Sequence, residues 1–499
     1  MRRHEIDGAT VSEGESPGPL AGRLSFGCDP RDEDLDTIGL THVVQQLVVR
    51  AQPSAANDND QITGMGDTGF SGVAGSPAQV VEQVAAICTV LDNLPPADLA
   101  DALADVASRD RHLWVTGRGP LNPFGSLLAR RYGARGAGLL RWPEVDPRLF
   151  TAEDIRRHVR TFFTTGNAVL SLSGAAPPDL RLPLPPGPQV TRFTPSARHQ
   201  AGPIWYADEV GGVQLAFLGG PDPATELLLR ILTSRVNEAL GRAGYAHTAQ
   251  SEVLEHDADV HEHGLGFPTS PRDTTGSDTA GAAEVLWAEF QRLVVEGPAQ
   301  AEIDEPVALW AEFYRLVAEG STQEAFDEAI VAAGIPPFSI LGSPDEWELL
   351  GTPGFIPSPD PMDRLLRFTA AQARDVMAGW FSSAMMVVPH GTRPALPGAV
   401  EQTCPRSSGR PSGQVYRPPM LKRLRSKGAL IICSDSAAIV DGDGNVHTVP
   451  LADALLIEQG GRHLLAHTGH GCVTDISDYS AGVARLRSVL PPRRVRQGR

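Results

Sequence analysis

The stretch Gly39-Leu40-Thr41-His42-Val43-Val44-Gln45-Gln46, with the residues just after it, decides how the first part of this chain folds. Apolar residues recur at intervals of three and four, at Leu40, Val43, Val44, Leu47 and Val48. This spacing predicts an amphipathic helix with one apolar stripe. His42, Gln45 and Gln46 share the opposite face, because residues three and four apart are neighbours on a helix.

The polar face of this helix has the spacing of a zinc motif in which two functional groups are replaced. The motif H-x-x-E-H puts two imidazoles and one carboxylate on one face of a helix. Here Gln45 stands at the carboxylate position and Gln46 at the second imidazole position. A neutral amide is a poor zinc ligand, and it cannot take a proton from a metal-bound water. The alternative interpretation is an ordinary helix with His42 as a surface histidine.

Two segments far apart in the chain share one pattern, a helix followed by a buried strand. One segment begins at Thr151 and the other at Thr369, and threonine is a good N-cap residue. Counted from each threonine, matching residue types fall at the same offsets: Arg156 and Arg374, Phe162-Phe163 and Trp380-Phe381, Val169 and Val387. The shared offsets predict one ancestral α/β unit that is used twice.

A second repeat is closer in sequence. The segment 286–305 closely matches 309–328, and a glycine follows each expected helix, Gly297 in one copy and Gly320 in the other. Glycine at that position fits a helix C-cap. Two copies are too few for a solenoid, so we expect an added helical hairpin with Trp287 and Trp310 in one apolar seam.

The last part of the chain has a different composition. Residues 403–414 are rich in Ser, Gly, Pro and Arg, which indicates a linker. Short β-type runs follow, separated by turns at 441–445 and Gly460-Gly461, and a helix is expected over 480–490. Such spacing predicts a small antiparallel β domain.

The predicted fold class is α+β, with three parts. A first α/β unit spans 1–190 and contains the helix 39–50. A second unit spans 191–398 and contains the repeat 286–328. A linker and small β domain span 399–499, and the strands and closing helix of that domain are similar to a pleckstrin-like domain.

Composition excludes several classes of protein. The net charge of −17 argues against nucleic-acid binding. No stretch reaches the roughly 18 apolar residues of a membrane-spanning helix, and no apolar run follows the basic start, so no secretory signal is expected. Five scattered cysteines form no C-x-x-C pair and suggest no disulfide framework, which predicts a cytoplasmic protein. Of the 43 residues that are lysine or arginine, only Lys422 and Lys427 are lysines. This preference for arginine is typical of GC-rich bacterial genomes.

With these residues in view, the chain resembles the insulinase or pitrilysin-type metallopeptidases, the inverted zincins, in their bacterial two-repeat form. The likeness runs over roughly residues 5–395 and is stronger in the first half. Its carriers, in order, are Gly27, Arg31-Asp32-Glu33, the segment 39–42, Pro123-Phe124, Arg131-Tyr132-Gly133, the segment 162–170, Gly174 and the run Leu184-Pro185-Pro186-Gly187. The resemblance implies two homologous units arranged as a half-clam.

The chain departs from the family pattern at three places. Gln45 and Gln46 replace two groups of the metal helix. The family's distal glutamate ligand follows on the next long helix, and here the matching segment 98–110 contains no glutamate. The family's second half supplies a substrate-binding arginine and tyrosine, but Gly241 stands at the arginine position and Tyr245 matches only across a gap. One ligand of three does not hold zinc usefully, so we expect no catalytic residue and no metal here.

Three other clusters contain potential metal ligands. The segment 255–263 is dense in His, Asp and Glu, and His261 and His263 would share one face of a strand. His467, His470 and Cys472 lack a fourth ligand nearby in sequence. Residues 441–445 begin like a calcium loop, but Val446 and Ala452 replace its required glycine and glutamate, which indicates a turn.

The resemblance and its departures together predict a non-catalytic subunit of a heteromeric zinc peptidase. The expected partners are a catalytically active homologous subunit, which would carry the zinc, and a peptide substrate. One alternative is an active metallohydrolase with a relocated site such as 255–263. The other is a stand-alone peptide-binding scaffold.

Overall fold

The computed structural model describes residues 2–14, 20–51, 61–63, 68–73, 76–108, 120–191, 202–220, 222–255, 260–269, 277–318, 363–407, 409–420 and 428–498. The last ten residues of the predicted repeat, 319–328, with the expected helix end at Gly320, lie outside the described residues, as do residues 256–259.

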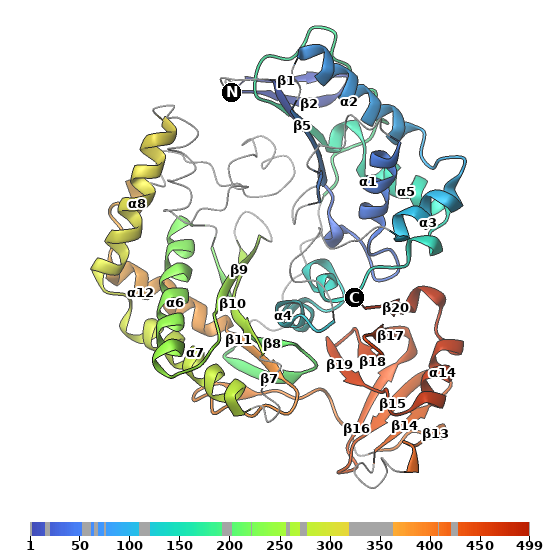
Figure 1. Ribbon diagram of the computed structural model, residues 1–499, viewed down its shortest axis with the longest axis vertical. Coiled ribbons are helices and arrows are strands. Elements are labelled where there is room, and N and C mark those ends of the chain that lie inside the picture. Colours follow the sequence, from blue (N-terminus) through green and yellow to red (C-terminus); the bar gives the residue numbers. More distant parts are fainter. Residues whose placement is uncertain are drawn as a thin grey trace.

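The first unit is a six-stranded sheet covered on one face by helices. The strand order is β1 (Arg2–Ile6), β2 (Ala9–Glu13), β6 (Ala168–Leu172), β3 (Ala21–Phe26), β5 (Thr68–Val73) and β4 (Gln61–Thr63). The helices on its outer side are α1 (Leu40–Arg50), α2 (Pro77–Asp92), α3 (Leu99–Ser108) and α5 (Ala152–Phe162) (Figure 1). Helix α2 begins with a capping box, which Ser76 and Gln79 form on either side of Pro77.

The second unit repeats this arrangement. Its six-stranded sheet has the order β12 (Val400–Glu401), β7 (Ile204–Asp208), β11 (Met385–Pro389), β8 (Gly212–Gly219), β10 (His261–Pro268) and β9 (Gln250–Glu255). Its helices are α6 (Pro223–Arg242), α7 (Ser277–Glu296), α8 (Gln300–Ala318) and α12 (Ala370–Ser383). The edge strand β12 lies just past residue 398, the predicted end of this unit. The helices of both units lie on the outside of the molecule and the two sheets face its middle (Figure 1).

The predicted duplication is confirmed by the strand pairing. In the first unit β6 pairs parallel with β2 and antiparallel with β3. In the second unit β11 pairs parallel with β7 and antiparallel with β8. The preceding helices α5 and α12 begin with matching capping boxes at Thr151 and Thr369. The two expected threonine caps therefore start equivalent helices.

The repeated helices of the second unit both pack on α6. Gly297 ends α7 with a positive φ of 75°, and its N–H donates to the Leu293 carbonyl, as expected of a C-cap. Trp287 and Trp310 are buried in one apolar core, together with Trp380 of α12.

Helix α4 (Pro123–Tyr132) joins the two units. It belongs to the first half of the chain, but it packs against the inner face of the second sheet through an apolar cluster of its own: Phe124, Leu127, Leu128 and Tyr132 from α4 with Ile204, Tyr206, Ala216, Met385 and Val387 from the sheet. The second sheet is therefore covered on both faces, which explains its nearly continuous apolar strands.

The C-terminal part contains two four-stranded sheets and a closing helix. One sheet has the order β13 (Gln414–Tyr416), β14 (Ala429–Ile432), β15 (Ser436–Val440), β16 (Val446–Pro450), and the other β19 (Cys472–Asp475), β18 (Arg462–His467), β17 (Ala454–Gln459), β20 (Val495–Gln497). Both sheets and α14 (Ser480–Val489) share one apolar core. The 441–445 segment is a turn, as predicted, because Asp441 accepts hydrogen bonds from the N–H groups of Asp443 and Asn445.

Short 3₁₀ helices complete the fold, at Pro30–Asp32, Gly136–Arg141, Pro147–Leu149, Thr165–Asn167, Leu451–Asp453 and Pro492–Arg494. The last of them returns the chain to the first unit, where Arg493 pairs with Asp154 and Arg494 with Asp36. Within the described residues, no helix is both long and apolar enough to cross a membrane.

Candidate functional site

Helix α1, which carries the degenerate zinc motif, begins at a tightly constrained turn. Gly39 has φ 97°, and a Cβ on it would lie 2.8 Å from the Cβ of Glu144, so only glycine fits. The Glu33 carboxyl accepts hydrogen bonds from the N–H groups of Gly39 at 2.7 Å and Thr41 at 2.6 Å. Burial raises the pKa of Glu33 to about 8, because the charged form loses its hydration. Glu33 therefore caps the first turn of α1.

His42 lies inside the protein and not on its surface. Only 5% of the residue is exposed, and its Nδ1 lies 3.3 Å from a carboxylate oxygen of Glu144. Interpreting it as a surface histidine is therefore wrong. The sequence shows the helix spacing but not Glu144, which lies 102 positions along the chain.

Gln45 is also fully buried, and its amide is used. The Nε2 donates to the backbone carbonyl of Gly69 on β5 at 3.3 Å. A glutamate at this position would place a carboxylate against a carbonyl oxygen, with no proton between them at neutral pH. Gln46 is half-buried. His42 and Gln45 thus connect α1 to other parts of the first unit.

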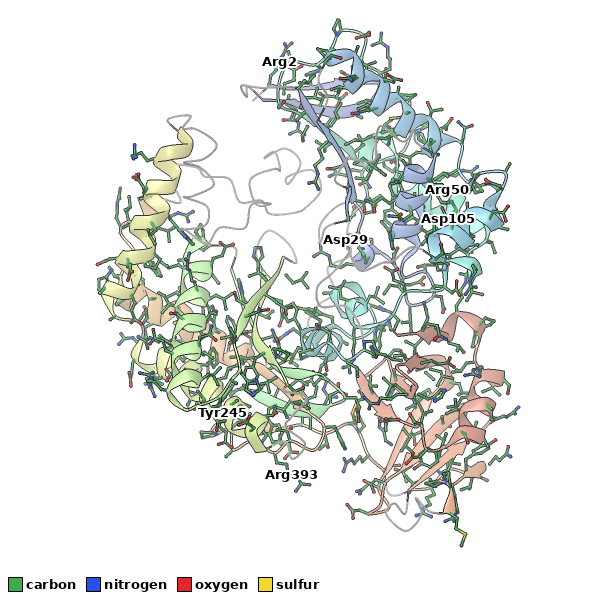
Figure 2. The ribbon with its side chains drawn as sticks, in the orientation of Figure 1. Arg2, Asp29, Arg50, Asp105, Tyr245 and Arg393 are labelled. Atoms are coloured by element: carbon green, nitrogen blue, oxygen red, sulfur yellow. A yellow bond between two sulfur atoms is a disulfide. The ribbon has the colours of Figure 1, made fainter. Side chains whose placement is uncertain are left out.

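The acidic residues of the expected distal-ligand segment form ion pairs with α1. Arg50, the last residue of α1, contacts Asp98 at 2.7 Å and Asp105 of α3 at 3.6 Å. Figure 2 shows Arg50 and Asp105 side by side. These carboxylates contact the guanidinium at the C-terminal end of α1, about two turns beyond His42. The segment's last two residues, 109–110, lie outside the described residues.

A buried histidine contacts α1 from α5. The Nε2 of His158 lies 2.9 Å from the hydroxyl oxygen of Thr41, and burial lowers the pKa of His158 to about 3. Because folding lowers the pKa of this histidine, the unfolded chain binds the proton at a higher pH than the folded chain does. Stability is therefore lost as the pH drops through the unfolded value of about 6.5.

The His158→Gln variant tests this linkage. Going from pH 7 to pH 5 is expected to cost the native chain about 2 kcal/mol more unfolding free energy than it costs the variant. The other titrating groups are present in both proteins, so their contributions to the change in unfolding free energy cancel in the comparison. The measurement is denaturant unfolding of both proteins at the two pH values. Equal losses would contradict a buried, neutral His158.

Tyr245, the predicted substrate-contact position, follows the end of α6 and is half-buried. A Cβ on Gly281 of α7 would lie 2.0 Å from its hydroxyl oxygen, so the ring packs closely on that helix. Figure 2 places Tyr245 well away from Asp29, which precedes α1. Gly241, at the expected arginine position, is exposed. A role for Tyr245 in peptide binding stays a prediction.

The described part of the segment 255–263 is a core strand. His261 and His263 share one face of β10, as predicted, with ring centroids 6.0 Å apart. His263 stacks with Phe217 and Trp380, and burial lowers its pKa to about 3. Glu262 points to the opposite face and pairs with Arg131 of α4 at 3.0 Å. These are packing and ion-pairing roles inside the second unit.

The C-terminal histidines do have additional ligands nearby. Among the described residues, Cys404, His447 and Cys472 form a group of three whose ligand atoms all lie within 4.8 Å of one another. His467 and His470 stand beside it. Cys404 and Cys472 are joined by a disulfide, so the expectation of no disulfide is wrong. The spacing of the cysteines in the sequence did not indicate this disulfide, because Cys404 and Cys472 lie 68 residues apart.

Comparison with known proteins agrees with this geometry at the level of the fold. No family model and no curated protein matches the chain by sequence. Among solved structures, a protease from Helicobacter pylori is 14% identical, with TM-score 0.54, over 77% of this chain and 98% of its own. The first half of the periplasmic protease PqqL from Escherichia coli is 14% identical, with TM-score 0.53, over 78% and 92%.

A third structure has the same fold. The peptidase M16 inactive domain from Pseudomonas fluorescens is 15% identical, with TM-score 0.52, over 79% of this chain and 99% of its own. The chain therefore has the fold of the insulinase-type, or M16, peptidases, as the resemblance predicted, with a further β-rich C-terminal part.

Proposed function

We propose that this chain is a non-catalytic subunit of a heteromeric zinc peptidase and helps to form the chamber that binds the peptide. The observation that carries the proposal is the environment of α1. Both six-stranded sheets of the two units are present, while two positions of the zinc motif contact other parts of the first unit: His42 lies against Glu144 and Gln45 donates to Gly69. A structure with the same fold is described as an inactive domain.

The chemistry of the donor set supports the same proposal. A catalytic zinc site needs three protein ligands and one open position for water. The motif positions of α1 supply one imidazole, and the acidic residues Asp98 and Asp105 neutralise Arg50. Zinc and the general base would therefore come from a homologous partner with an intact motif. The proposed setting is the bacterial cytoplasm, with a ribosomally made precursor peptide as substrate.

The two alternatives differ in their support. An active enzyme with a relocated site at 255–263 requires accessible ligands, and the described histidines there are buried among aromatic rings. A stand-alone peptide-binding scaffold would have the same fold. Co-purification separates it from the leading proposal, because a subunit brings down an intact zinc-motif homologue and a scaffold does not.

The purified chain alone is expected to cleave no peptide, and His42→Ala is expected to leave its zinc content unchanged. The reason is that one imidazole held by Glu144 does not retain zinc. The measurement is metal analysis and peptide cleavage on the native chain and the variant, with Gln46→Ala as a matched change on the same helix. Peptide cleavage together with bound zinc, both lost on His42→Ala, would overturn the proposal.

A further inference from the structure

The group Cys404, His447 and Cys472 lies where three parts of the chain meet. Cys404 is in the linker that follows the second unit, His447 is on β16, and Cys472 begins β19 in the other C-terminal sheet. In a tetrahedral zinc site with bonds of about 2.0–2.3 Å, the ligand atoms lie about 3.3–3.8 Å apart. The three ligand atoms lie within 4.8 Å of one another, and the two sulfur atoms, which are joined here as a disulfide, must move apart on reduction to reach that spacing.

The ring of His447 is oriented as a metal ligand requires. Its Nδ1 lies 3.1 Å from the backbone carbonyl of Pro405, two positions before Ser407, which pairs with Val446. With the proton on Nδ1, that atom donates to the carbonyl and the Nε2 lone pair is available. Metal-binding histidines commonly donate the second ring N–H to a backbone carbonyl in this way.

His467 supplies a second, independent observation. It is 6% exposed, and its Nδ1 has no hydrogen-bond partner among the described residues. Its ring lies 5.4 Å from that of His447, while its Nε2 lies 4.0 Å from the Asp453 carboxylate. A buried ring nitrogen without a hydrogen bond lowers the stability of the fold, and binding to a metal ion would remove this cost.

The electrostatic surroundings favour thiolates. Arg130 of α4 places its Nη1 3.4 Å from the sulfur of Cys472 and 4.0 Å from that of Cys404. A guanidinium beside a thiol stabilises the deprotonated form, which is the form that binds metals. The same side chain donates to the backbone carbonyls of Thr403 and His470 and so holds both cysteine segments.

We propose that Cys404, His447, Cys472 and His467 form a structural zinc site in the reduced protein. The disulfide first takes two electrons and two protons from a dithiol reductant, which becomes a disulfide in turn. Binding of Zn²⁺ then releases both thiol protons and leaves a neutral centre with two thiolates and two imidazoles. Sulfur and imidazole ligands in tetrahedral order select zinc among the common divalent ions.

The site would fix the C-terminal part against the rest of the molecule. Its ligands come from the linker and from both C-terminal sheets, and Arg130 connects them to α4. The turn before Cys472 already lies on α4, since a Cβ on Gly471 would meet the Ala129–Arg130 backbone at 2.9 Å. The proposal does not depend on the proposed subunit role, because none of its residues lies in α1.

Metal analysis of the full chain, purified with a dithiol reductant and then freed of excess zinc, tests the site. We expect about one zinc per chain, and cobalt substitution should give the absorption of tetrahedral thiolate coordination. Cys404→Ser, Cys472→Ser and His447→Ala should weaken zinc binding more than about 100-fold, because even outer-shell partners of zinc cost about 10–100-fold. His467→Ala should weaken it at least about tenfold. Cys433→Ser, a change at a free cysteine of the same domain, and His42→Ala should retain zinc.

Two results would overturn the proposal. One is a reduced, folded chain that binds no zinc, with Cys404 and Cys472 acting only as a disulfide pair. The other is zinc retained by the Cys404→Ser/Cys472→Ser double variant. Zinc binding unchanged in His467→Ala would refute the four-residue assignment. Circular dichroism of each variant shows whether it is folded, and a native reduced chain that becomes less stable when its zinc is removed supports the site.

Discussion

Replacing Arg131 with methionine is expected to destabilise the second unit by about 3–5 kcal/mol, the range for a buried charge left without its partner. Arg131 and Glu262 are both fully buried, and Arg131 also donates to the Ser383 carbonyl at 2.8 Å. Glu262 accepts a further hydrogen bond from the hydroxyl of Tyr132 at 2.8 Å. Removing the guanidinium leaves the Glu262 carboxylate inside the protein without its ion-pair partner.

Denaturant unfolding followed by tryptophan fluorescence measures this effect, since Trp205, Trp287, Trp310 and Trp380 are buried in the second unit. The double variant Arg131→Met/Glu262→Gln should recover part of the loss, because the buried charge is then gone. Arg156→Met is the matched control, because its pair with Glu153 is exposed and should contribute less than about 1 kcal/mol. A loss of that small size in Arg131→Met would contradict the assigned pair.

Replacing Asp208 with asparagine is expected to cost a similar 3–5 kcal/mol, at the junction of all three parts of the chain. Asp208 on β7 accepts from Arg141 at 2.6 Å and from the hydroxyl of Ser126 on α4 at 2.7 Å. Arg141 also donates to the Gly471 carbonyl at 2.7 Å, and the Val473 N–H donates to Asp208. The asparagine keeps the shape but leaves the Arg141 charge unpaired.

The expected readout includes detachment of the C-terminal part. Limited proteolysis should cut the linker 403–414 faster in Asp208→Asn than in the native chain, in addition to the lower unfolding free energy. Glu209→Gln is the control at the neighbouring position, because Glu209 pairs with the partly exposed Arg462 and should matter by less than about 1 kcal/mol. Unchanged proteolysis and stability in Asp208→Asn would show that the junction does not hold the parts together.

Local patterns predicted much of the fold correctly. The caps at Thr151 and Thr369 start helices as expected, because a cap depends on a few adjacent residues. The duplication was readable for the same reason, since helix and strand keep their offsets. The role of α4 was not readable, because its ten residues carry no sign of which sheet they cover.

The site was predicted less well, because its environment comes from distant segments. The helix spacing of His42 and Gln45 was right, but their burial depends on Glu144 and Gly69 from other elements. His261 and His263 face one side of β10 as expected, whereas Trp380, which stacks on His263, lies more than a hundred residues later. Cys404 and His447 join Cys472 only through the pairing of whole sheets.

The central claim is that this chain contributes a chamber and not chemistry. The most direct measurement is co-expression with a homologue from the same genome that carries an intact H-x-x-E-H motif, followed by purification and peptide cleavage. We predict a stable complex whose cleavage survives His42→Ala in this chain and disappears when the glutamate of the partner's motif is changed to glutamine. Cleavage that is lost on His42→Ala while the complex stays intact would contradict the claim.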